Sequence, residues 1–285
     1  VYHTRVLKVV ALSGGFSRDE ACAQIAKNPG MIASFSRALL EELRAQQDDG
    51  QFDAVLKEAI DAIHAAIRRG DAYQMNYTVR AHARFSGDAQ SYYEQLRQAQ
   101  QAEFCAYADI GTHRILSASP ELFFSWQDGV LTTRPMKGTA RRGQLPEEDA
   151  ELARWLRNSE KNRAENLMIV DLLRNDLSRV AKIGTVNVPV LCGLETYASV
   201  HHLVSVVTAE LAEGRDIADV IAATFPGGSI TGAPKIKAME VIGSLERVPR
   251  GVYCGAIGAI GFDGEADLNI AIRTVTIRDH KIRFH

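Results

Sequence analysis

The chain has 285 residues, 46% of them hydrophobic, and a formal net charge of −2. This is enough apolar material for a core in one large domain or two ordinary ones, and it excludes a disordered chain. The balanced charge speaks against nucleic acid as a partner, and no apolar run approaches the ~20 residues that cross a membrane.

The hydrophobic pattern predicts helices and strands in blocks. Residues 17–70 read as helical, most clearly at 52–69, where apolar residues recur at helical spacing up to a stop at Gly70. Further helices are expected at 91–102, 147–181 with a break near Asn158, 216–224 and 234–246. Alternating segments predict strands within 73–85, 104–138, 185–211, 253–262 and 267–277. Such blocks favour an α+β fold with an antiparallel sheet over a doubly wound parallel sheet.

The loop Phe225–Lys235 combines two glycines, a serine and a threonine, and it leads through Pro234 into a predicted helix. Proline is tolerated in a first helical turn, and Ser229 or Thr231 can cap that turn. Because free N–H groups at a helix start bind anions, the loop predicts a carboxylate or phosphate site. A capped helix after a tight turn is the alternative. Neither the P-loop pattern nor the nucleophile elbow fits these residues.

Two residues of the strand-rich central region are candidates for acid–base or nucleophilic chemistry. Glu121 precedes an apolar strand, where a half-buried setting would raise the pKa of its carboxyl; an ordinary surface acid is the alternative. Lys137 lies at the end of a predicted strand, before Gly138. It is either a solvated lysine or, beside Arg134 and a metal, an amine with a lowered pKa.

One predicted helix carries a candidate metal pair. Asn162 and Glu165 are three residues apart and therefore share a helix face. Two oxygen ligands at this spacing suit Mg²⁺, whereas the alternative is a solvated helix face. Asp171, Arg174 and Asp176, further along the helix, are expected to form structural ion pairs and caps.

Two further candidates lie in predicted strands. His201 and His202 are adjacent, so they point to opposite faces, and only one of them can enter a given pocket. Arg273 lies in an apolar strand, where a buried guanidinium needs a partner such as a substrate carboxylate. Together, the candidates describe a site for a small substrate with several negative charges.

Seven segments, in this order, resemble the chorismate-utilising enzymes: Tyr73–Asn76, Ser119–Glu121, Arg134–Thr139, Arg163–Asp171, Val200–Ser205, Phe225–Lys235 and Ile270–Thr274. The resemblance implies an α+β fold of two orthogonally packed antiparallel β-sheets flanked by helices, with the active site between the sheets. It implies a chorismate-binding catalytic domain at 51–285, which leaves an unassigned and mostly helical segment at 1–50.

The resemblance also implies a reaction. Lys137 is similar to the nucleophile of the members that convert chorismate and ammonia to 4-amino-4-deoxychorismate, a step towards folate. Lys137 would attack C2 while Glu121 protonates the departing C4 hydroxyl, and ammonia would then replace the lysine. Gln74 stands where water-using relatives carry a lysine base, which favours ammonia. His202 matches the pocket histidine, and Glu165 resembles a ligand of Mg²⁺, the implied cofactor.

The other residues carried over by the resemblance are expected to contact the substrate, namely Arg134, Thr139, Ser229, Thr231, Gly232, Tyr253 and Arg273. The implied partners are chorismate, ammonia and a glutamine amidotransferase that releases the ammonia; no nucleic acid or membrane is expected. Asn162 replaces the usual acidic residue of the family. A glycine-rich turn and a second pair of metal-binding glutamates belong beyond His285, so we expect a catalytic domain truncated at its C-terminus.

Two other hypotheses stay open. One is a family member that makes anthranilate, although such enzymes usually carry alanine at the position of Lys137. The other is a non-catalytic chorismate-binding protein. Asn162 and the missing C-terminal segment are the observations that support it. Because the four cysteines lie far apart and no signal peptide is recognisable, a cytoplasmic location with reduced thiols is expected.

Overall fold

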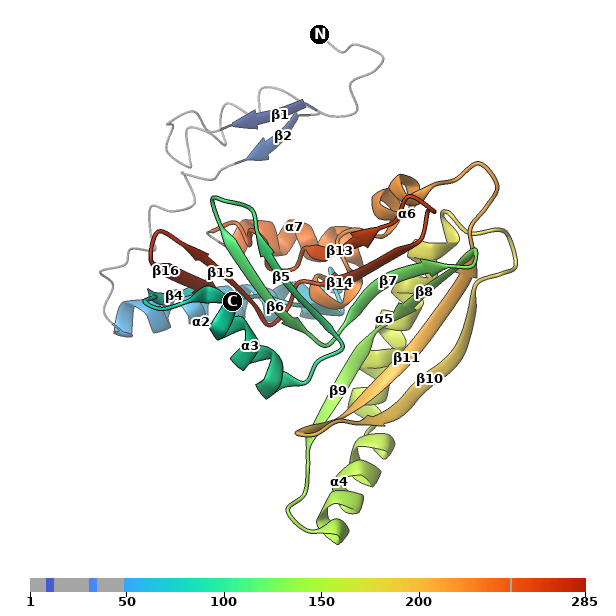
Figure 1. Ribbon diagram of the computed structural model, residues 1–285, viewed down its shortest axis with the longest axis horizontal. Helices are drawn as coiled ribbons and strands as arrows, with labels where there is room; N and C mark the ends of the chain where they lie inside the picture. Colours follow the sequence, from blue (N-terminus) through green and yellow to red (C-terminus); the bar gives the residue numbers. More distant parts are fainter. Residues whose placement is uncertain (1–8, 13–30, 35–48, 247) are drawn as a thin grey trace. The chain divides into compact units, whose positions relative to one another are not determined.

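The computed structural model describes residues 9–12, 31–34, 49–246 and 248–285 (Figure 1). The chain divides into two compact units: one comprises residues 1–71 and 240–249, and the other residues 72–239 and 250–285. This division follows from compactness alone, so the catalytic domain at 51–285 stays a prediction.

The first unit contains two short strands and a long helix. Strands β1 (Val9–Leu12) and β2 (Met31–Ser34) pair in parallel. Helix α2 (Asp49–Arg68) ends just before Gly70, whose φ is 79°, which confirms the predicted helix and its stop. The helix prediction is wrong for residues 31–34, because a short apolar run suits a strand as well as a helix, and here it pairs with β1. The rest of segment 1–48 lies outside the described residues.

The larger sheet of the second unit has seven strands in the order β10-β11-β8-β7-β14-β13, with β9 also paired to β11. All its pairings are antiparallel, as predicted. Its strands are β7 (Leu122–Gln127), β8 (Val130–Arg134), β9 (Met136–Arg141), β10 (Asn187–Thr196), β11 (Val200–Glu210), β13 (Ala256–Ile260) and β14 (Ala266–Ile270).

The smaller sheet has five antiparallel strands in the order β4-β16-β15-β6-β5. They are β4 (Ala81–Arg84), β5 (Phe104–Asp109), β6 (Arg114–Ser119), β15 (Thr274–Arg278) and β16 (Lys281–Phe284). The chain passes between the two sheets at β6–β7 and again at β14–β15, and Figure 1 shows that it changes direction sharply between β6 and β7. A separate two-stranded ladder joins β3 (Gln74–Met75) to β12 (Gly232–Ala233). The strand predicted at 73–85 is thus split between β3 and β4.

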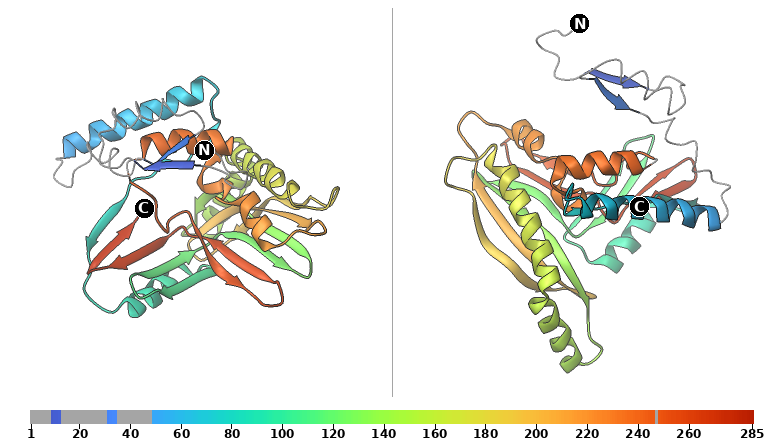
Figure 2. Two further views of the ribbon diagram at one scale, coloured as in Figure 1. Left: turned by 90° about the horizontal axis from the view of Figure 1, so that it is seen from above. Right: turned by 180° about the vertical axis from the view of Figure 1, so that it is seen from behind.

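Helix α3 (Ala89–Gln100) packs on the smaller sheet, and α4 (Pro146–Asn158), α5 (Glu160–Ser178) and α6 (Ile217–Thr224) pack on the larger sheet (Figure 2). The 3₁₀ turn η2 (Gly228–Ile230) and α7 (Lys235–Leu245) follow α6 in the chain, and α7 runs from the second unit into the first. The predicted break near Asn158 is confirmed, because α5 starts anew with Ser159 as its N-cap. Within the described ranges, no helix is long and apolar enough to cross a membrane.

The main core lies between α5, α6 and the larger sheet. Buried Val170 and Leu177 of α5 pack with Leu131, Val207 and Phe124 of the sheet. A smaller core joins α3 to the five-stranded sheet. Two antiparallel sheets flanked by helices confirm the predicted α+β class.

Candidate active site

Strand β9 carries Lys137 at a β-bulge. The β9–β11 register shifts at this point, so that Lys137 and Gly138 together face the single residue Leu203. Gly138 has a φ of 93°, and an added Cβ there would lie 3.0 Å from Cβ of Asn162. Only glycine suits this position, and such a bulge turns the neighbouring side chain away from the regular strand direction.

Lys137 projects into a polar cluster drawn from four separate elements. Its Nζ donates a hydrogen bond to the backbone oxygen of Ser229 at 2.9 Å and lies 3.9 Å from Oε1 of Glu165. Gln74 Nε2 donates to the same Oε1 at 2.8 Å. The fold thus brings together Gln74, Lys137, Glu165 and Ser229, which were all predicted as site residues.

Glu121, in the short connection between β6 and β7, is almost completely buried, with 4% of its surface exposed. Burial raises the pKa of its carboxyl to about 7, and the Ser229 hydroxyl, the charge of Lys137 and the N–H of Met136 oppose this only in part. A carboxyl with this pKa is about half protonated near neutral pH. It can therefore act as a proton donor, and it is more deeply buried than the sequence suggested.

His202 and Thr139 form a second pair beside the bulge. The two residues are direct cross-strand partners, and Nδ1 of His202 lies 2.9 Å from Oγ1 of Thr139. Burial is the main cause that lowers the pKa of the His202 imidazole, and the charge of Arg273 adds to it. The lowered pKa favours the neutral form of the ring.

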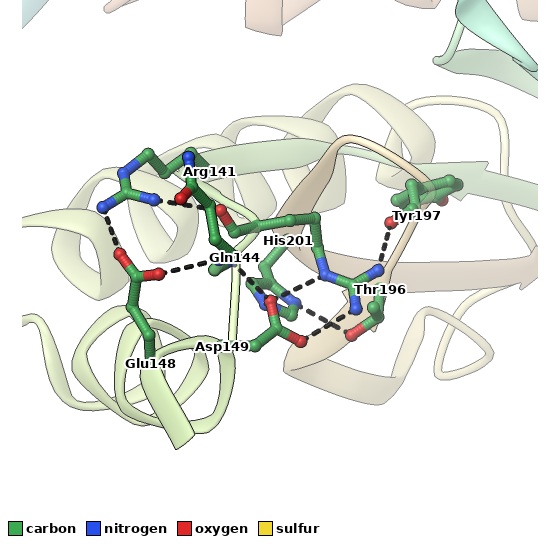
Figure 3. Close-up of polar contacts among 9 residues, drawn as sticks. Arg141, Gln144, Glu148, Asp149, Thr196, Tyr197 and His201 are labelled. Atoms are coloured by element: carbon green, nitrogen blue, oxygen red, sulfur yellow. Dashed lines mark hydrogen bonds and ion pairs between the residues drawn. The ribbon is translucent and has the colours of Figure 1, made fainter. Parts of the chain in front are cut away.

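The adjacent His201 belongs to a different network, on the α4 side of the strand (Figure 3). Its Nε2 lies 3.0 Å from Oδ1 of Asp149, and its Nδ1 lies 2.9 Å from Oγ1 of Thr196. Arg142 binds both oxygens of Asp149 at 2.8 Å, and together with the N–H of Gly143 it holds the pKa of that carboxyl well below its usual range. The expectation that the two histidines serve different faces is confirmed, and His201 has a structural role.

Arg134 is engaged by carboxylates of the protein itself. Its guanidinium donates to Glu103 Oε2 at 2.9 Å and to the two oxygens of Glu195 at 2.9 and 3.1 Å. Tyr197 donates to Glu195 as well, at 2.5 Å. The predicted substrate contact of Arg134 therefore stays a prediction, and it would require this guanidinium to exchange a partner.

Arg273 is not the buried strand residue that was expected. It is exposed and lies between β14 and β15 with a φ of 47°, and its Nη1 donates to Gln100 Oε1 at 2.8 Å. The apolar residues around it misled the prediction, because the chain leaves one sheet for the other at this point. Tyr253 is half-buried and stacks on His285 with ring centroids 4.7 Å apart.

The loop Phe225–Lys235 contacts the cluster through the backbone oxygen of Ser229. Neither Ser229 nor Thr231 caps α7: Ser229 lies in η2, and Thr231 Oγ1 donates to the backbone oxygen of Gly227 at 3.0 Å. The capping prediction is wrong because η2 intervenes before the helix. Gly232 pairs with β3, and an added Cβ there would lie 2.2 Å from the backbone oxygen of Gln74.

Two buried polar atoms of this cluster lack a hydrogen bond of normal geometry. Five such side-chain atoms occur in the described part of the chain, and Gln74 Oε1 and Ser229 Oγ are among them. Because buried polar groups are nearly always satisfied, Gln74 Oε1 is a candidate contact for a polar ligand, whereas the Ser229 hydroxyl lies beside the carboxyl of Glu121.

The predicted Mg²⁺ site is incomplete in the described residues. They contain no group of three or more His, Cys, Asp or Glu that could hold a metal. Glu165 is a single carboxylate that already accepts from Gln74, and the Asn162 amide donates to Ser159 Oγ at 2.8 Å at the start of α5. One carboxylate is too little to hold Mg²⁺ without further ligands.

The sequence did not single out Asn166. Its side chain is fully buried and donates a hydrogen bond to the backbone oxygen of Lys137. The available signal was its position on the apolar stripe of α5, one turn ahead of Ile169 and Val170. A polar residue at such a position needs internal hydrogen-bond partners.

Comparison with known proteins identifies the family. The family described as chorismate binding enzyme matches residues 18–285. The chain belongs to this family. It is 48% identical to aminodeoxychorismate synthase component 1 of Escherichia coli (strain K12), over 77% of this chain and 48% of the relative. It is 42% identical to anthranilate synthase component 1 of Aquifex aeolicus (strain VF5), over 81% of this chain and 46% of the relative.

A solved structure of the same family has a similar fold. Anthranilate synthase component I from Streptococcus pneumoniae TIGR4 superposes with a TM-score of 0.75 at 31% identity, covering 95% of this chain and 61% of that chain. The family and fold predictions are thereby confirmed. The chain spans about half the length of the curated relatives it matches.

Proposed function

We propose that this chain carries catalytic residues of an aminodeoxychorismate synthase component I, which converts chorismate and ammonia to 4-amino-4-deoxychorismate. The observation that carries the proposal is the placement of Lys137 Nζ in a polar cluster beside the buried acid Glu121. The two relatives described above leave two products to choose from, and Lys137 favours the aminodeoxychorismate branch.

The proposed roles follow from the chemistry of each group. The amine of Lys137, in its neutral form, attacks C2 of chorismate, the ring double bond shifts, and the C4 hydroxyl departs as water with the proton of Glu121. Ammonia then adds at C4, the double bond returns, and the lysine leaves from C2. The lysine thereby divides a difficult substitution into two steps. Gln74 Oε1 has no hydrogen-bond partner within the described residues and would bind a polar group of the substrate, and the Ser229 hydroxyl would stay beside the carboxyl of Glu121.

Further parts of the proposal extend beyond the described residues. Relatives named component 1 imply a second component, for which we propose a glutamine amidotransferase that supplies ammonia. The enzyme would be of the aminotransferring class and cytoplasmic. Mg²⁺ would supply charge stabilisation for the substrate carboxylate, with Glu165 as one ligand.

The test is identification of the product by liquid chromatography and mass spectrometry. Full-length protein is incubated with chorismate, magnesium and ammonium, beside Lys137→Ala and, as a matched control, Lys161→Ala on the exposed face of α5. We expect aminodeoxychorismate from the wild type and from the control, and a rate at least about 100-fold lower from Lys137→Ala.

The second candidate is an anthranilate synthase component I, which the Aquifex and Streptococcus relatives favour by their names. Anthranilate as the product would select this candidate and make Lys137 incidental. Bound chorismate without any product would instead select the non-catalytic binding protein.

A further inference from the structure

We propose that Asn166 is a positioning residue that holds the β-bulge of Lys137 in the shape that directs its amine into the site. This inference rests on the proposed function of Lys137. The starting observation is that the amide nitrogen of Asn166 donates to the backbone oxygens of Lys137, at 3.3 Å, and of Leu203, at 3.1 Å. These are carbonyls on the two strands that face each other across the bulge.

The orientation of the Asn166 amide is set by a relay of hydrogen bonds. The backbone N–H of Cys192 donates to Ser205 Oγ at 2.9 Å, so the hydroxyl hydrogen of Ser205 is free to point elsewhere. That hydroxyl donates to Asn166 Oδ1 at 2.5 Å. With its oxygen occupied in this way, the amide turns both N–H groups towards the bulge carbonyls, and every polar atom of the fully buried side chain is satisfied.

The same turn of α5 therefore contacts both the backbone and the amine of Lys137. Asn166 binds its backbone oxygen, and the preceding residue, Glu165, places a carboxylate oxygen 3.9 Å from its Nζ. A bulge is a deformable point in a ladder, because an extra residue interrupts the regular hydrogen bonds. A shift of about 1 Å in a reacting group can reduce a rate about 100-fold, so the fixed bulge geometry matters more for the reaction than for folding.

The experiment compares Asn166→Asp with Thr224→Val in the full-length enzyme. Asn166→Asp is nearly isosteric but removes both N–H donors to the bulge. Thr224→Val is the matched control: it is also nearly isosteric and removes a buried side-chain hydrogen bond, the one to the backbone oxygen of Val220 at 2.7 Å, that is not part of the relay. For Asn166→Asp we expect kcat to fall at least about 100-fold with KM for chorismate within about threefold. For Thr224→Val we expect kcat within about threefold of the wild type.

A second readout does not depend on turnover. The Lys137 amine is acetylated with acetic anhydride, and its labelling rate is measured by peptide mass spectrometry relative to that of Lys161. We expect Asn166→Asp to change the relative rate at Lys137 at least about threefold and Thr224→Val to leave it unchanged. If the wild type makes no aminodeoxychorismate, the proposed function fails, and labelling still decides whether Asn166 positions the amine.

Folding is followed by urea denaturation. A purely structural role predicts that both variants lose stability and activity in parallel, with unchanged labelling of Lys137, and that result overturns the proposal. If Asn166→Asp does not fold, the smaller Asn166→Ser, which also loses the paired donors, takes its place with the same expected results.

Discussion

Burial of single ionisable groups sets the chemistry of the candidate site. Glu121 has only 4% of its surface exposed, and burial raises its pKa to about 7, whereas Glu165, with 30% of its side chain exposed, is a partner for Gln74 and Lys137. Two carboxyls in one cluster are thus suited to different tasks, one to proton transfer and one to binding.

Glu121→Gln should remove the proton donor while preserving shape. We expect kcat/KM for chorismate to fall about 100- to 10,000-fold, the usual contribution of a general acid. In the wild type, kcat/KM should decline as the pH rises through about 7, because the acid form is then lost. Steady-state rates across pH 5 to 9 check this. An unchanged rate in Glu121→Gln would refute the role, and Glu213→Gln, on the surface, serves as control.

The same pKa makes a prediction for stability. Since the folded-state pKa of Glu121 lies above the unfolded value of 4.5, its proton stabilises the native state fully below about pH 4.5. That contribution is lost as the pH rises through about 7. Urea unfolding of wild type and Glu121→Gln should therefore show the wild type losing stability relative to the variant between these pH values. Parallel curves would contradict a raised pKa.

Hydrogen bonds and an ion pair at its two ends hold loop 225–235 in position. Lys235, at the start of α7, pairs with Asp176 of α5 and donates to the backbone oxygen of Thr224, at the end of α6, at 2.8 Å. One lysine therefore holds the end of one helix against the start of the next. The ion pairs predicted for Asp171, Arg174 and Asp176 are confirmed.

Lys235→Met should destabilise the protein by about 3–5 kcal/mol, because it leaves the carboxylate of Asp176 buried without its partner. Burial already raises the pKa of Asp176, so the loss should be larger at pH 8 than at pH 5. Urea denaturation measures it. The double variant Lys235→Met/Asp176→Leu is the control: it should recover much of the stability, and an equal loss in both variants would argue against the buried pair.

Gly232→Ala should separate β12 from β3, because the new Cβ would meet the backbone oxygen of Gln74 at 2.2 Å in a conformation that side chains rarely adopt, with a φ of 146°. We expect a higher KM for chorismate as Gln74 is displaced. Gly243→Ala in α7, where an added Cβ meets nothing within 4 Å, should leave activity unchanged and is the matched control. Equal kinetics in the two variants would show that this ladder does not support the site.

At the scale of the whole molecule, buried polar side chains join the two sheets. Asn269 of β14 donates from Nδ2 to the backbone oxygen of Phe104 in β5 at 2.7 Å, and its Oδ1 accepts from the N–H of Ile257 in β13 at 3.1 Å. Ser119, at the end of β6, donates to the backbone oxygen of Ile270 at 2.6 Å. These bonds hold the sheets together around Glu121.

Asn269→Leu should destabilise the protein by about 1–3 kcal/mol, because it removes the hydrogen bonds that the half-buried N–H of Ile257 and the half-buried carbonyl of Phe104 make with this side chain. Chemical denaturation measures the change, with the exposed Asn175→Leu as control. If the two variants unfold at the same denaturant concentration, the junction contributes nothing measurable.

Local sequence signals determined the elements of this protein. Helical periodicity and Gly70 predicted α2 and its end, and the break near Asn158 separated α4 from α5. These predictions succeeded because helix periodicity and stops involve residues within a few positions of each other. The family segments also predicted the cluster of Gln74, Lys137 and Glu165, although their joint geometry could not be read from spacing.

Tertiary structure alone decided the direction and environment of the side chains. The β9 bulge beneath Lys137, the pairing of Arg134 with Glu103 and Glu195, and the exposure of Arg273 all depend on residues distant in sequence. Sequence patterns record which face of an element is apolar. They do not indicate which distant group will pair with a charge or donate a hydrogen bond to a carbonyl, because those contacts form only when the elements pack.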